Sequence, residues 1–589
     1  MECRQSMPLS ARTQKNQWVV RDADERAEGL ARSLKIAPLV AQVLINRGIT
    51  EAQTGSVFLQ PKLTALIRPD RMPGVGPAVG RLRDAIEQKQ RITIYGDYDV
   101  DGITGVSILW QLLTLLGAEV DYYIPHRIDE GYGLNSEAVR SIADSGSRVL
   151  VTVDCGITGF EAADLARELG LDVIITDHHQ PGPVLPSAAA VVHPALDESY
   201  PNQDSAGALV AYKLAWALAD DLSKGPRLGP ELREFMLNAT SLAAMGTVAD
   251  VVDLRGENRI VTSFGLQSLS TSNLCGVRAL IETAGLTGQG LDSYAIGFRL
   301  APMLNAAGRM GHARLAVELM TSTSELRAMQ IAEYLKAQNV QRQQCERKMF
   351  KEACKMVVER GLNHPDHKSI VLAAEGWHTG VLGIVASRLV DKFYRPTVMI
   401  NASPAEDGAA QGSGRSIARF GLLGAIQACS SHLASFGGHK MAAGLTIVPE
   451  KIEGFAADFE AYAASNLTEE DIVAHLHIDA IAPLRLFTVD AVNQLERVGP
   501  FGQGNPKPVF ATKGVRLAAA PRRVGARGDH LQFAITDNTA TIRCVGFRMG
   551  NLEKKLLDCE CFNIAYEAQI NRYNGNTSVE FITKDIQFE

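Results

Sequence analysis

The chain has 589 residues, of which 46% are hydrophobic and 21% are charged. It is too long for one hydrophobic core, so we expect three or four domains, and its composition excludes a largely disordered chain. The net charge of −7 excludes a uniformly basic surface, so any nucleic-acid binding must come from local patches.

Targeting signals are not evident in the sequence. No apolar run approaches the roughly 18 to 20 residues that a membrane-spanning helix needs, and the N-terminal residues lack the apolar core of a secretory signal. The nine cysteines are scattered and odd in number, which is typical of a reducing compartment rather than a disulfide framework. We therefore expect a cytoplasmic protein.

The predicted elements begin with an N-terminal helical extension over residues 1–74, followed by an α/β domain over 75–322. Short β-rich runs at 91–96, 148–154 and 172–177 alternate with helical patterns at 105–117 and 159–170. This alternation predicts a parallel sheet with crossover helices. A further helical region continues to about residue 320.

Beyond this domain, the pattern predicts a connecting helix, a second α/β domain and a barrel. The helix lies within 323–361 and, if it is continuous, measures on the order of 50 Å. The second α/β domain covers 362–465, with strands at 369–375 and 396–400 around a helix near 380–392. Several short strands with polar turns in 466–589 are typical of a small β-barrel.

The strongest chemical signal is "YGDYDVDG" at 95–102, where Asp97, Asp99 and Asp101 follow an apolar strand. If the chain stays extended there, alternate side chains point the same way and the three carboxylates converge. Converging carboxylates repel one another unless a cation neutralises them or some remain protonated. A solvated acidic turn is the alternative interpretation.

Two more strands end in the same way. "VTVDCG" delivers Asp154, and "ITDHH" delivers Asp177, His178 and His179, at the carboxyl edge where open α/β sheets bind ligands. Carboxylate and imidazole ligands without thiolate favour Mn²⁺ or Mg²⁺ over structural zinc. Asp250 in "MGTVADVVDL" is a further acidic candidate, with Asp253 as its competitor.

In order, the motifs "DYDVDG", "VDCG", "TDHH" and "GTVAD" resemble those of the DHH phosphoesterases. Later segments resemble RecJ-like exonucleases of that family: "NAAGRM" (305–310), "GWHTGVLGIVASRL" (376–389), "SGRS" (413–416), "FGGHKMAAG" (436–444) and "GPFGQGNPKPVF" (499–510). The resemblance covers roughly residues 35 to 515.

The resemblance implies hydrolysis assisted by two ions, Mn²⁺ or Mg²⁺. The implied metal ligands are Asp97, Asp99, Asp101, Asp154, His178 and Asp250, and the implied catalytic residues are Asp99, Asp101, His178 and His179. His179 would contact the scissile phosphate. Many DHH pyrophosphatases have a histidine where this chain has Tyr95, which leaves the ligands of the second metal open, with Asp97 as a substitute.

Candidate substrate-binding residues lie in both α/β domains. Arg127 and Arg309 are candidate phosphate contacts, and Tyr132 could stack on a base. The resemblance makes 362–465 a DHH-associated domain that closes over the substrate. There we expect Ser413 and Arg415 in a glycine-flanked loop that brings backbone N–H groups to phosphate, and His439 in a tight turn.

The predicted barrel resembles the OB-fold that RecJ proteins carry. Between Lys513 and Arg572 there are ten Lys and Arg residues against six acidic ones, in a chain that is acidic overall. A basic groove with interspersed aromatic residues is how OB-folds bind single strands. The available aromatic residues are Phe533, Phe547, Tyr566 and Tyr573, although aromatic residues on strands are core at least as often.

These patterns favour a single-stranded-DNA-specific exonuclease of recombination and repair. Its 5′-to-3′ polarity is implied by the resemblance alone, as are a single-stranded-DNA-binding protein and a RecQ-type helicase as partners. One alternative is a DHH phosphodiesterase for short oligonucleotides or cyclic dinucleotides, which the barrel argues against. Another is a non-catalytic scaffold, which the intact "DYDVDG" and "TDHH" argue against.

Overall fold

The computed structural model describes residues 16–126, 130–131, 133–223, 225, 227–309, 312–403 and 408–588. The chain falls into two compact units. We call the first the central unit, which consists of Val57–Val340 and Val498–Lys507. We call the second the composite unit, which consists of Met1–Ser56, Gln341–Arg497 and Pro508–Glu589.

A five-stranded parallel sheet forms the first part of the central unit. Its order is β3-β2-β4-β5-β6, and every neighbouring pair is parallel. In a doubly wound sheet of this order, the strand sequence reverses between β2 and β4, which is where such folds bind ligands. The strands are β2 (Ile92–Gly96), β3 (Val120–Tyr123), β4 (Val149–Val153), β5 (Asp172–Thr176) and β6 (Ala190–Val192).

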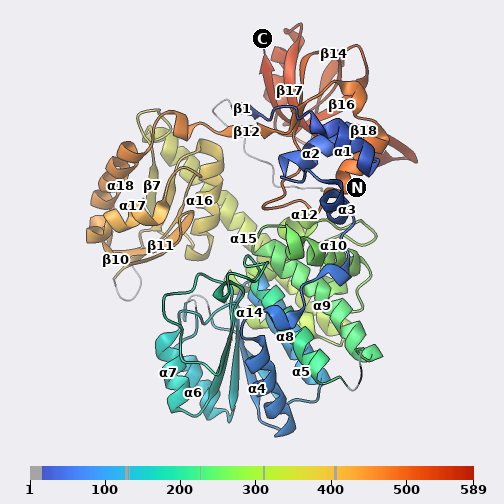
Figure 1. The fold of residues 1–589 in the computed structure, drawn as a ribbon. Helices are drawn as coiled ribbons and strands as arrows, with labels where there is room; N and C mark the ends of the chain where they lie inside the picture. Colours follow the sequence, from blue (N-terminus) through green and yellow to red (C-terminus); the bar gives the residue numbers. More distant parts are fainter. Residues whose placement is uncertain are drawn as a thin grey trace. The chain divides into compact units, whose positions relative to one another are not determined.

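Helices cover both faces of this sheet, because its strands are apolar on both sides. On β4, Val149 and Val151 pack with helices α4, α5 and α8, whereas Leu150 packs with α6 and α7 (Figure 1). The strands and helices expected over 91–177 are therefore present. The bounds of the helices are α4 (Val75–Glu87), α5 (Val100–Leu115), α6 (Ser136–Asp144), α7 (Phe160–Glu168) and α8 (Gly207–Asp221).

A helical part completes the central unit and includes a segment from much later in the chain. The Arg259 guanidinium donates to the carbonyl of Val498 (2.8 Å), and the Leu254 amide donates to the carbonyl of Gln503 (2.8 Å). Segment 498–507 therefore packs on the helical part. Its helices are α9 (Pro230–Ala249), α10 (Gly256–Ser270), α11 (Cys275–Thr283), α12 (Ser293–Ala295), a π-helical turn (Ile296–Leu300), α13 (Ala301–Arg309) and α14 (Ala313–Thr321).

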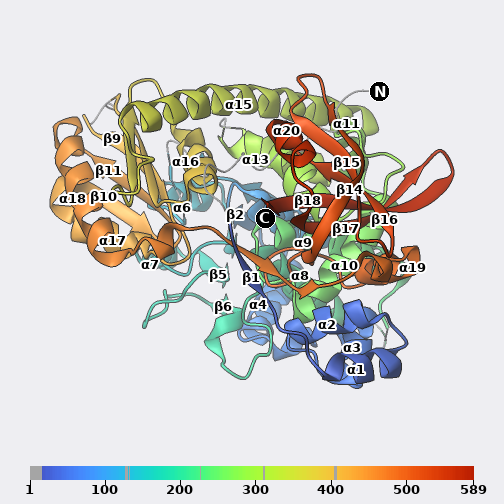
Figure 2. The same cartoon turned by 90° about the horizontal axis from the view of Figure 1, so that it is seen from above.

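The long helix expected near 323–361 is present as α15 (Glu325–Glu359), one continuous helix of 35 residues (Figure 2). At 1.5 Å per residue it is about 50 Å long. Leu335 belongs to the core of the central unit, whereas Ala353 belongs to a core of the composite unit. The helix therefore connects the two units along the chain.

The composite unit contains a second five-stranded sheet of order β10-β11-β9-β8-β7. Only β7 and β8 are parallel; the other neighbours are antiparallel. Its strands are β7 (Ile370–Ala374), β8 (Thr397–Asn401), β9 (Ala410–Arg415), β10 (Leu433–Gly438) and β11 (Ala442–Ile447). Its helices are α16 (Thr379–Phe393), α17 (Leu422–Ala428) and α18 (Ile452–Asn466).

The expected barrel is confirmed. Five strands form a ring that closes through pairing of β14 with β17. Phe533 and Tyr566 are buried in its core, whereas Phe547 and Tyr573 are exposed. The elements are β13 (Ala480–Ile481), β14 (Phe510–Val524), β15 (His530–Thr536), β16 (Thr541–Gly546), β17 (Phe562–Tyr573) and β18 (Asn576–Phe588), with helices α19 (Val489–Glu496) and α20 (Glu553–Leu557).

The N-terminal region contains a strand as well as the expected helices. Strand β1 (Gln17–Val20) pairs in parallel with β12 (His475–Ile478), so this region is joined to a segment more than 450 residues later. The helices that follow are α1 (Arg26–Leu34), α2 (Pro38–Asn46) and α3 (Ala52–Leu59). Within the described ranges, no helix has the length and apolar character that crossing a membrane requires.

Candidate active site

The first cluster of acidic residues lies where β2 passes into α5. Asp99 caps this helix, because its Oδ1 accepts from the backbone N–H groups of Asp101 (2.8 Å) and Gly102 (3.2 Å). Asp101 therefore lies in the first helical turn, and the expectation of an extended chain over these residues is wrong. Capping by Asp99 turns the backbone into a helix one residue after the cap.

Asp101 is almost fully buried and is held by the start of α8. Its carboxylate accepts from the backbone N–H groups of Gly207 (2.6 Å) and Ala208 (2.9 Å). Helix α9 passes so close that a Cβ on Gly246 would lie 2.4 Å from Asp101 Oδ1. Only glycine permits this approach, so the sequences of three helices fix the position of this carboxylate.

Asp154 follows β4 and has a left-handed backbone conformation, with φ of 63°. An aspartate tolerates this conformation better than most residues, but the conformation still costs energy and often occurs at functional sites. Asp154 is buried, and a Cβ on Gly207 would lie 2.7 Å from the Cβ of Asp154. The turn therefore directs this carboxylate toward the same helix start that holds Asp101.

The third strand, β5, is followed by Asp177, His178 and His179. His179 Nδ1 lies 2.8 Å from Asp177 Oδ1, whose other carboxylate oxygen accepts from the Ile157 amide (2.9 Å). Although burial opposes it, the hydrogen bond to Asp177 raises the pKa of His179. Asp177 therefore orients the His179 ring and favours a proton on Nδ1.

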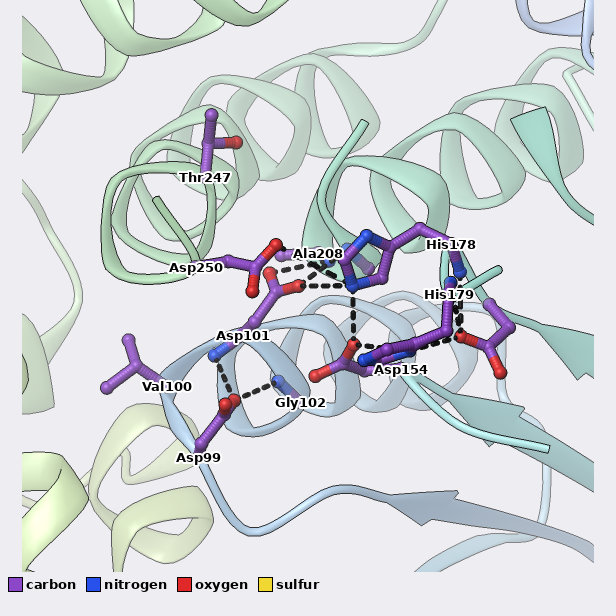
Figure 3. A network of polar contacts seen from close by, with 12 residues as sticks. Asp99, Val100, Asp101, Gly102, Asp154, His178, His179, Ala208, Thr247 and Asp250 are labelled. Carbon is purple, nitrogen blue, oxygen red and sulfur yellow. Dashed lines mark hydrogen bonds and ion pairs between the residues drawn. The ribbon is translucent and has the colours of Figure 1, made fainter. Parts of the chain in front are cut away.

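His178 is the centre of the cluster (Figure 3). Its Nε2 lies 3.0 Å from Asp154 Oδ1, 3.6 Å from Asp250 Oδ2 and 3.8 Å from Asp101 Oδ2. Asp250 reaches this point from the end of α9, where it is the C-cap. Residues from three strand ends and one helix end therefore meet at one edge of the sheet.

The charges of this cluster fit a divalent cation. Burial, together with repulsion from Asp99, raises the pKa of Asp101 to about 7, and burial with repulsion from Asp101 raises that of Asp250 to about 9. Burial lowers the pKa of His178 to about 4, so its ring is neutral at pH 7. His178 Nε2 is buried without a hydrogen-bond partner while carboxylates surround it. A cation would relieve this repulsion and engage the imidazole nitrogen.

The oxygen and nitrogen atoms group into three sets that could each hold an ion. One set is Asp97, Asp99 and Asp154; another is Asp101, His178 and Asp250; the third is Asp154, His178 and His179. Asp154 is shared by two of them, as is His178. Asp253, the competitor of Asp250, belongs to none of the sets found among the described residues.

Tyr95 packs in the core that the sheet forms with α6 and α7. Its ring is fully buried and stacks on Tyr123, with ring centroids 5.5 Å apart. Its hydroxyl donates to the carbonyl of Gly133 (2.8 Å). Tyr95 is therefore a packing residue, and Asp97, two residues later, contributes an oxygen to one of the sets.

One candidate substrate-binding residue, Arg309, belongs to the same unit as the cluster. Arg309 ends α13, a helix that touches the 98–100 loop: its Asn305 accepts from the Val100 amide (3.2 Å), and a Cβ on Gly308 would lie 2.6 Å from the Tyr98 carbonyl oxygen. Arg127 and Tyr132 lie outside the described residues.

The other candidates, Ser413, Arg415 and His439, belong to the composite unit. The expectation of a loop for Ser413 and Arg415 is wrong, because both lie on strand β9 and their backbone groups are paired with β8 and β11. Arg415 Nη1 donates to Ser413 Oγ (3.1 Å), so the two side chains share one face of the strand. His439 is in a tight turn, in which its amide donates to the carbonyl of Ala442 (2.8 Å).

Two residues that support the histidines have no predicted role. The sequence predicts Asp177 at a strand end only, and its position directly before the histidine pair is the signal that could identify it. The other is buried His193, whose Nε2 lies 2.8 Å from the carbonyl oxygen of His179. It follows β6 by one residue, which is a weak signal.

Family models match three parts of the chain. The DHH family N-terminal domain matches residues 91–240, the DHHA1 domain matches 366–465, and the RecJ OB domain matches 478–585. The first match contains the whole cluster except Asp250. The second contains Ser413, Arg415 and His439, and the third contains the closed barrel except the last three residues of β18.

The chain is also similar to characterised proteins over nearly its whole length. It is 39% identical over 573 residues to the single-stranded-DNA-specific exonuclease RecJ of Bacillus subtilis, covering 97% of this chain and 71% of that protein. The crystal structure of Thermus thermophilus RecJ in complex with Mn²⁺ matches with a TM-score of 0.83 at 31% identity, covering 97% and 80% of the two chains. The Mg²⁺ complex of the same protein matches with a TM-score of 0.77 at 29% identity, covering 97% and 78%.

Proposed function

Because the chain belongs to the RecJ family of single-stranded-DNA-specific exonucleases, we propose that it degrades single-stranded DNA from the 5′ end. The cleavage is a metal-dependent hydrolysis of phosphodiester bonds. Mn²⁺ and Mg²⁺ are the ions named in the matching Thermus structures, and both bind carboxylate oxygens such as those of the cluster.

The observation that carries this proposal is the environment of His178 Nε2. A neutral imidazole nitrogen faces Asp101, Asp154 and Asp250 with no hydrogen-bond partner. Such an arrangement is unfavourable as a packed core and favourable as a cation site. It lies at the carboxyl edge of the sheet beside the β2/β4 reversal, where an α/β fold receives its ligand.

We assign the ligands according to the sets of close atoms. Asp97, Asp99 and Asp154 would hold one ion, and Asp101, His178 and Asp250 the other, with Asp154 near both. Bound ions supply positive charge that polarises the phosphodiester and stabilises the charge developing on it.

His179 is assigned to the scissile phosphate. Asp177 holds its Nδ1 (2.8 Å), and we assign its Nε2 to the substrate. The raised pKa of this ring favours a proton that can be donated to a phosphate oxygen. His193 holds the backbone of the same residue through the His179 carbonyl.

Several residues are proposed to bind the strand. Arg127 and Arg309 would contact phosphates, and Tyr132 would stack on a base. Ser413, Arg415 and His439 would receive the terminal phosphate, since a hydroxyl and a guanidinium on one strand face offer matching donors. The exposed basic residues of the barrel would hold the remainder of the strand.

We propose the cellular role, the partners and the domain roles from the family to which the chain belongs. The activity would serve DNA recombination and repair in the cytoplasm, alongside a single-stranded-DNA-binding protein and a RecQ-type helicase. The proposed domains are a catalytic domain (75–322), a connecting helix (323–361), a substrate-binding domain (362–465) and a nucleic-acid-binding barrel (466–589), preceded by the extension 1–74.

The decisive experiment is digestion of an oligonucleotide that carries a label at one end only. With a 5′ label and Mn²⁺ or Mg²⁺, the first labelled product should be a mononucleotide; with a 3′ label, a ladder should shorten progressively. Duplex DNA of the same sequence should resist, and a chelator should stop the reaction. A ladder from the 5′-labelled strand would show that digestion proceeds from the 3′ end. Equal digestion of the duplex would contradict the specificity for single-stranded DNA.

A further inference from the structure

Two aromatic rings of the central unit lie side by side on its surface. Tyr294 belongs to α12, and Phe298 belongs to the π-helical turn that follows it. Their ring centroids are 4.6 Å apart and their planes differ by 23°, so the rings are stacked. Tyr294 is 43% exposed and Phe298 is 62% exposed.

A stacked pair in which both rings are exposed is unusual among the described residues. Aromatic residues make up only 6% of it. Each of the other stacked pairs found among the described residues includes a ring with no exposed surface: Tyr95 with Tyr123, Phe455 with Phe459, and Tyr566 with Phe581. An adjacent pair that both face water forgoes the gain of burial, which indicates a surface that a ligand covers.

The segment that carries this pair packs on α9, the helix that ends at Asp250. A Cβ on Gly297, between the two rings in the chain, would lie 3.9 Å from Val248 Cγ1 in the last turn of α9. Further along the same run of helix, the side chain of Asn305 accepts from the Val100 amide (3.2 Å), between Asp99 and Asp101 in the chain. The rings therefore belong to a stretch of helix that leads to the cluster.

The residue after Asp250 is also exposed and apolar. Val251 is 61% exposed and has a left-handed φ of 65°. For a β-branched residue this conformation is strongly disfavoured, and such strain persists mainly at functional positions.

We propose that Tyr294 and Phe298 form a stacking platform for a nucleobase of the strand whose terminal phosphodiester lies at the Asp–His cluster. The inference rests on the proposed function, since it takes the substrate to be single-stranded DNA. Every base has a flat apolar face, so a stacked aromatic pair binds any sequence and suits an enzyme that must advance along its substrate. The platform holds one base while the next phosphodiester enters the cluster.

The test measures equilibrium binding in a chelator, where hydrolysis does not interfere. Fluorescence anisotropy gives the Kd for a single strand and for strands with one abasic nucleotide at successive positions from the 5′ end. Stacking of this kind corresponds to roughly a fivefold or larger change in affinity. One or two abasic positions should weaken binding to the wild-type protein by about five- to tenfold.

The variants separate stacking from general apolar contact. Phe298→Ala should weaken binding of the intact strand about five- to tenfold. The Kd of this variant should no longer change when an abasic nucleotide is placed at the positions that weaken binding to the wild-type protein. Phe298→Trp should restore both properties, whereas Phe298→Leu should not, because it keeps apolar volume without an aromatic face. Leu237→Ala is the matched control. It removes a 48% exposed apolar side chain from α9, the helix that ends at Asp250, at a point about 20 Å from Asp250 along the helix axis.

Three results would overturn the platform: unchanged binding in Phe298→Ala, an abasic profile that this variant leaves unaltered, or full restoration by leucine. Restoration by leucine would instead show that general apolar contact, and not ring stacking, binds the strand. The proposed function is tested separately, because a wild-type protein that binds the strand but never digests it with Mn²⁺ contradicts the function and not the platform.

Discussion

The two five-stranded sheets carry their candidate functional residues in different places. In the parallel sheet of the central unit, Asp97, Asp154 and Asp177 each directly follow the last residue of a strand. In the mixed sheet of the composite unit, Ser413 and Arg415 are part of strand β9 itself. Parallel strands bring their carboxyl ends to one edge, so their site is built from turns; antiparallel neighbours present a site as side chains on one face.

This difference affects how each site is held. The turns of the central unit depend on caps and close helix approaches, such as Gly246 beside Asp101. Strand β9 is fixed along its length by pairing on both sides, so Ser413 and Arg415 have little freedom in the backbone. We therefore expect substitutions at the edge of the parallel sheet to affect chemistry, and substitutions on β9 to affect substrate choice.

The largest expected effect is from Asp101→Ala. Loss of a buried carboxylate from the cluster should lower kcat by about a thousandfold or more, which corresponds to ~4 kcal/mol. Binding of single-stranded DNA should persist, because basic groups elsewhere hold the phosphates. Asp121→Ala is the control, since it changes a half-exposed aspartate on β3 of the same sheet. Activity above a few per cent in a folded Asp101→Ala protein would refute the assignment.

An intermediate effect is expected from Asp177→Asn. The change keeps the size of the side chain but removes the charge that orients His179 and favours its proton, so kcat should fall roughly 10- to 100-fold. The measurement is kcat and KM at saturating Mn²⁺, compared with Asp172→Asn at the exposed start of the same strand. A change confined to KM would show that Asp177 acts on the substrate and not on the histidine.

A tenfold or larger effect, selective for one substrate, is expected from Arg415→Ala. Charge-assisted hydrogen bonds to a terminal phosphate contribute about 1.5–3 kcal/mol, so kcat/KM on 5′-phosphorylated strands should fall by about tenfold or more. A small phosphodiester that occupies only the cluster should be affected less. Arg419→Ala, at a 70% exposed side chain nearby in the chain, is the control. Equal losses on both substrates would place Arg415 in the catalytic centre or the fold.

The smallest effect concerns the barrel. Replacing exposed Arg522 and Arg527 with alanine should weaken binding of long strands modestly and reduce the slope of log Kd against log salt by roughly 1 to 2. Activity on very short strands should not change. Arg140→Ala, an exposed arginine on α6, should leave the slope unaltered. If the double variant keeps the wild-type slope, these two arginines do not contact the strand.

Local sequence patterns predicted β2, β4 and β5 of the parallel sheet, β7 and β8 of the mixed sheet, the long helix and the barrel, because alternation and helical periodicity reflect burial directly. They did not predict that Asp101 lies in a helix, since the capping hydrogen bonds of Asp99 depend on where the helix begins. The loop expected for Ser413 and Arg415 is a strand, because pairing with β8 and β11 overrides the preference of flanking glycines.

Local sequence patterns could not predict contacts between segments that are far apart in the chain. The pairing of β1 with β12 joins segments that carry no sequence signal for each other. The three strand-end motifs indicated an ion-binding edge, but the contribution of Asp250 depends on how α9 packs against α5. The choice between core and surface for barrel aromatics also requires the tertiary structure: Phe533 and Tyr566 are buried, whereas Tyr573 is exposed.

The packing of residues 498–507 on the central unit has a consequence for biosynthesis. A ribosome adds roughly 5–20 residues per second, so the rest of this unit is made on the order of ten seconds before its last segment emerges. During that interval Arg259 lacks the Val498 carbonyl that it contacts in the finished protein. A nascent chain therefore completes its central unit only after the DHHA1 domain has been translated, which delays the mature enzyme until most of the polypeptide exists.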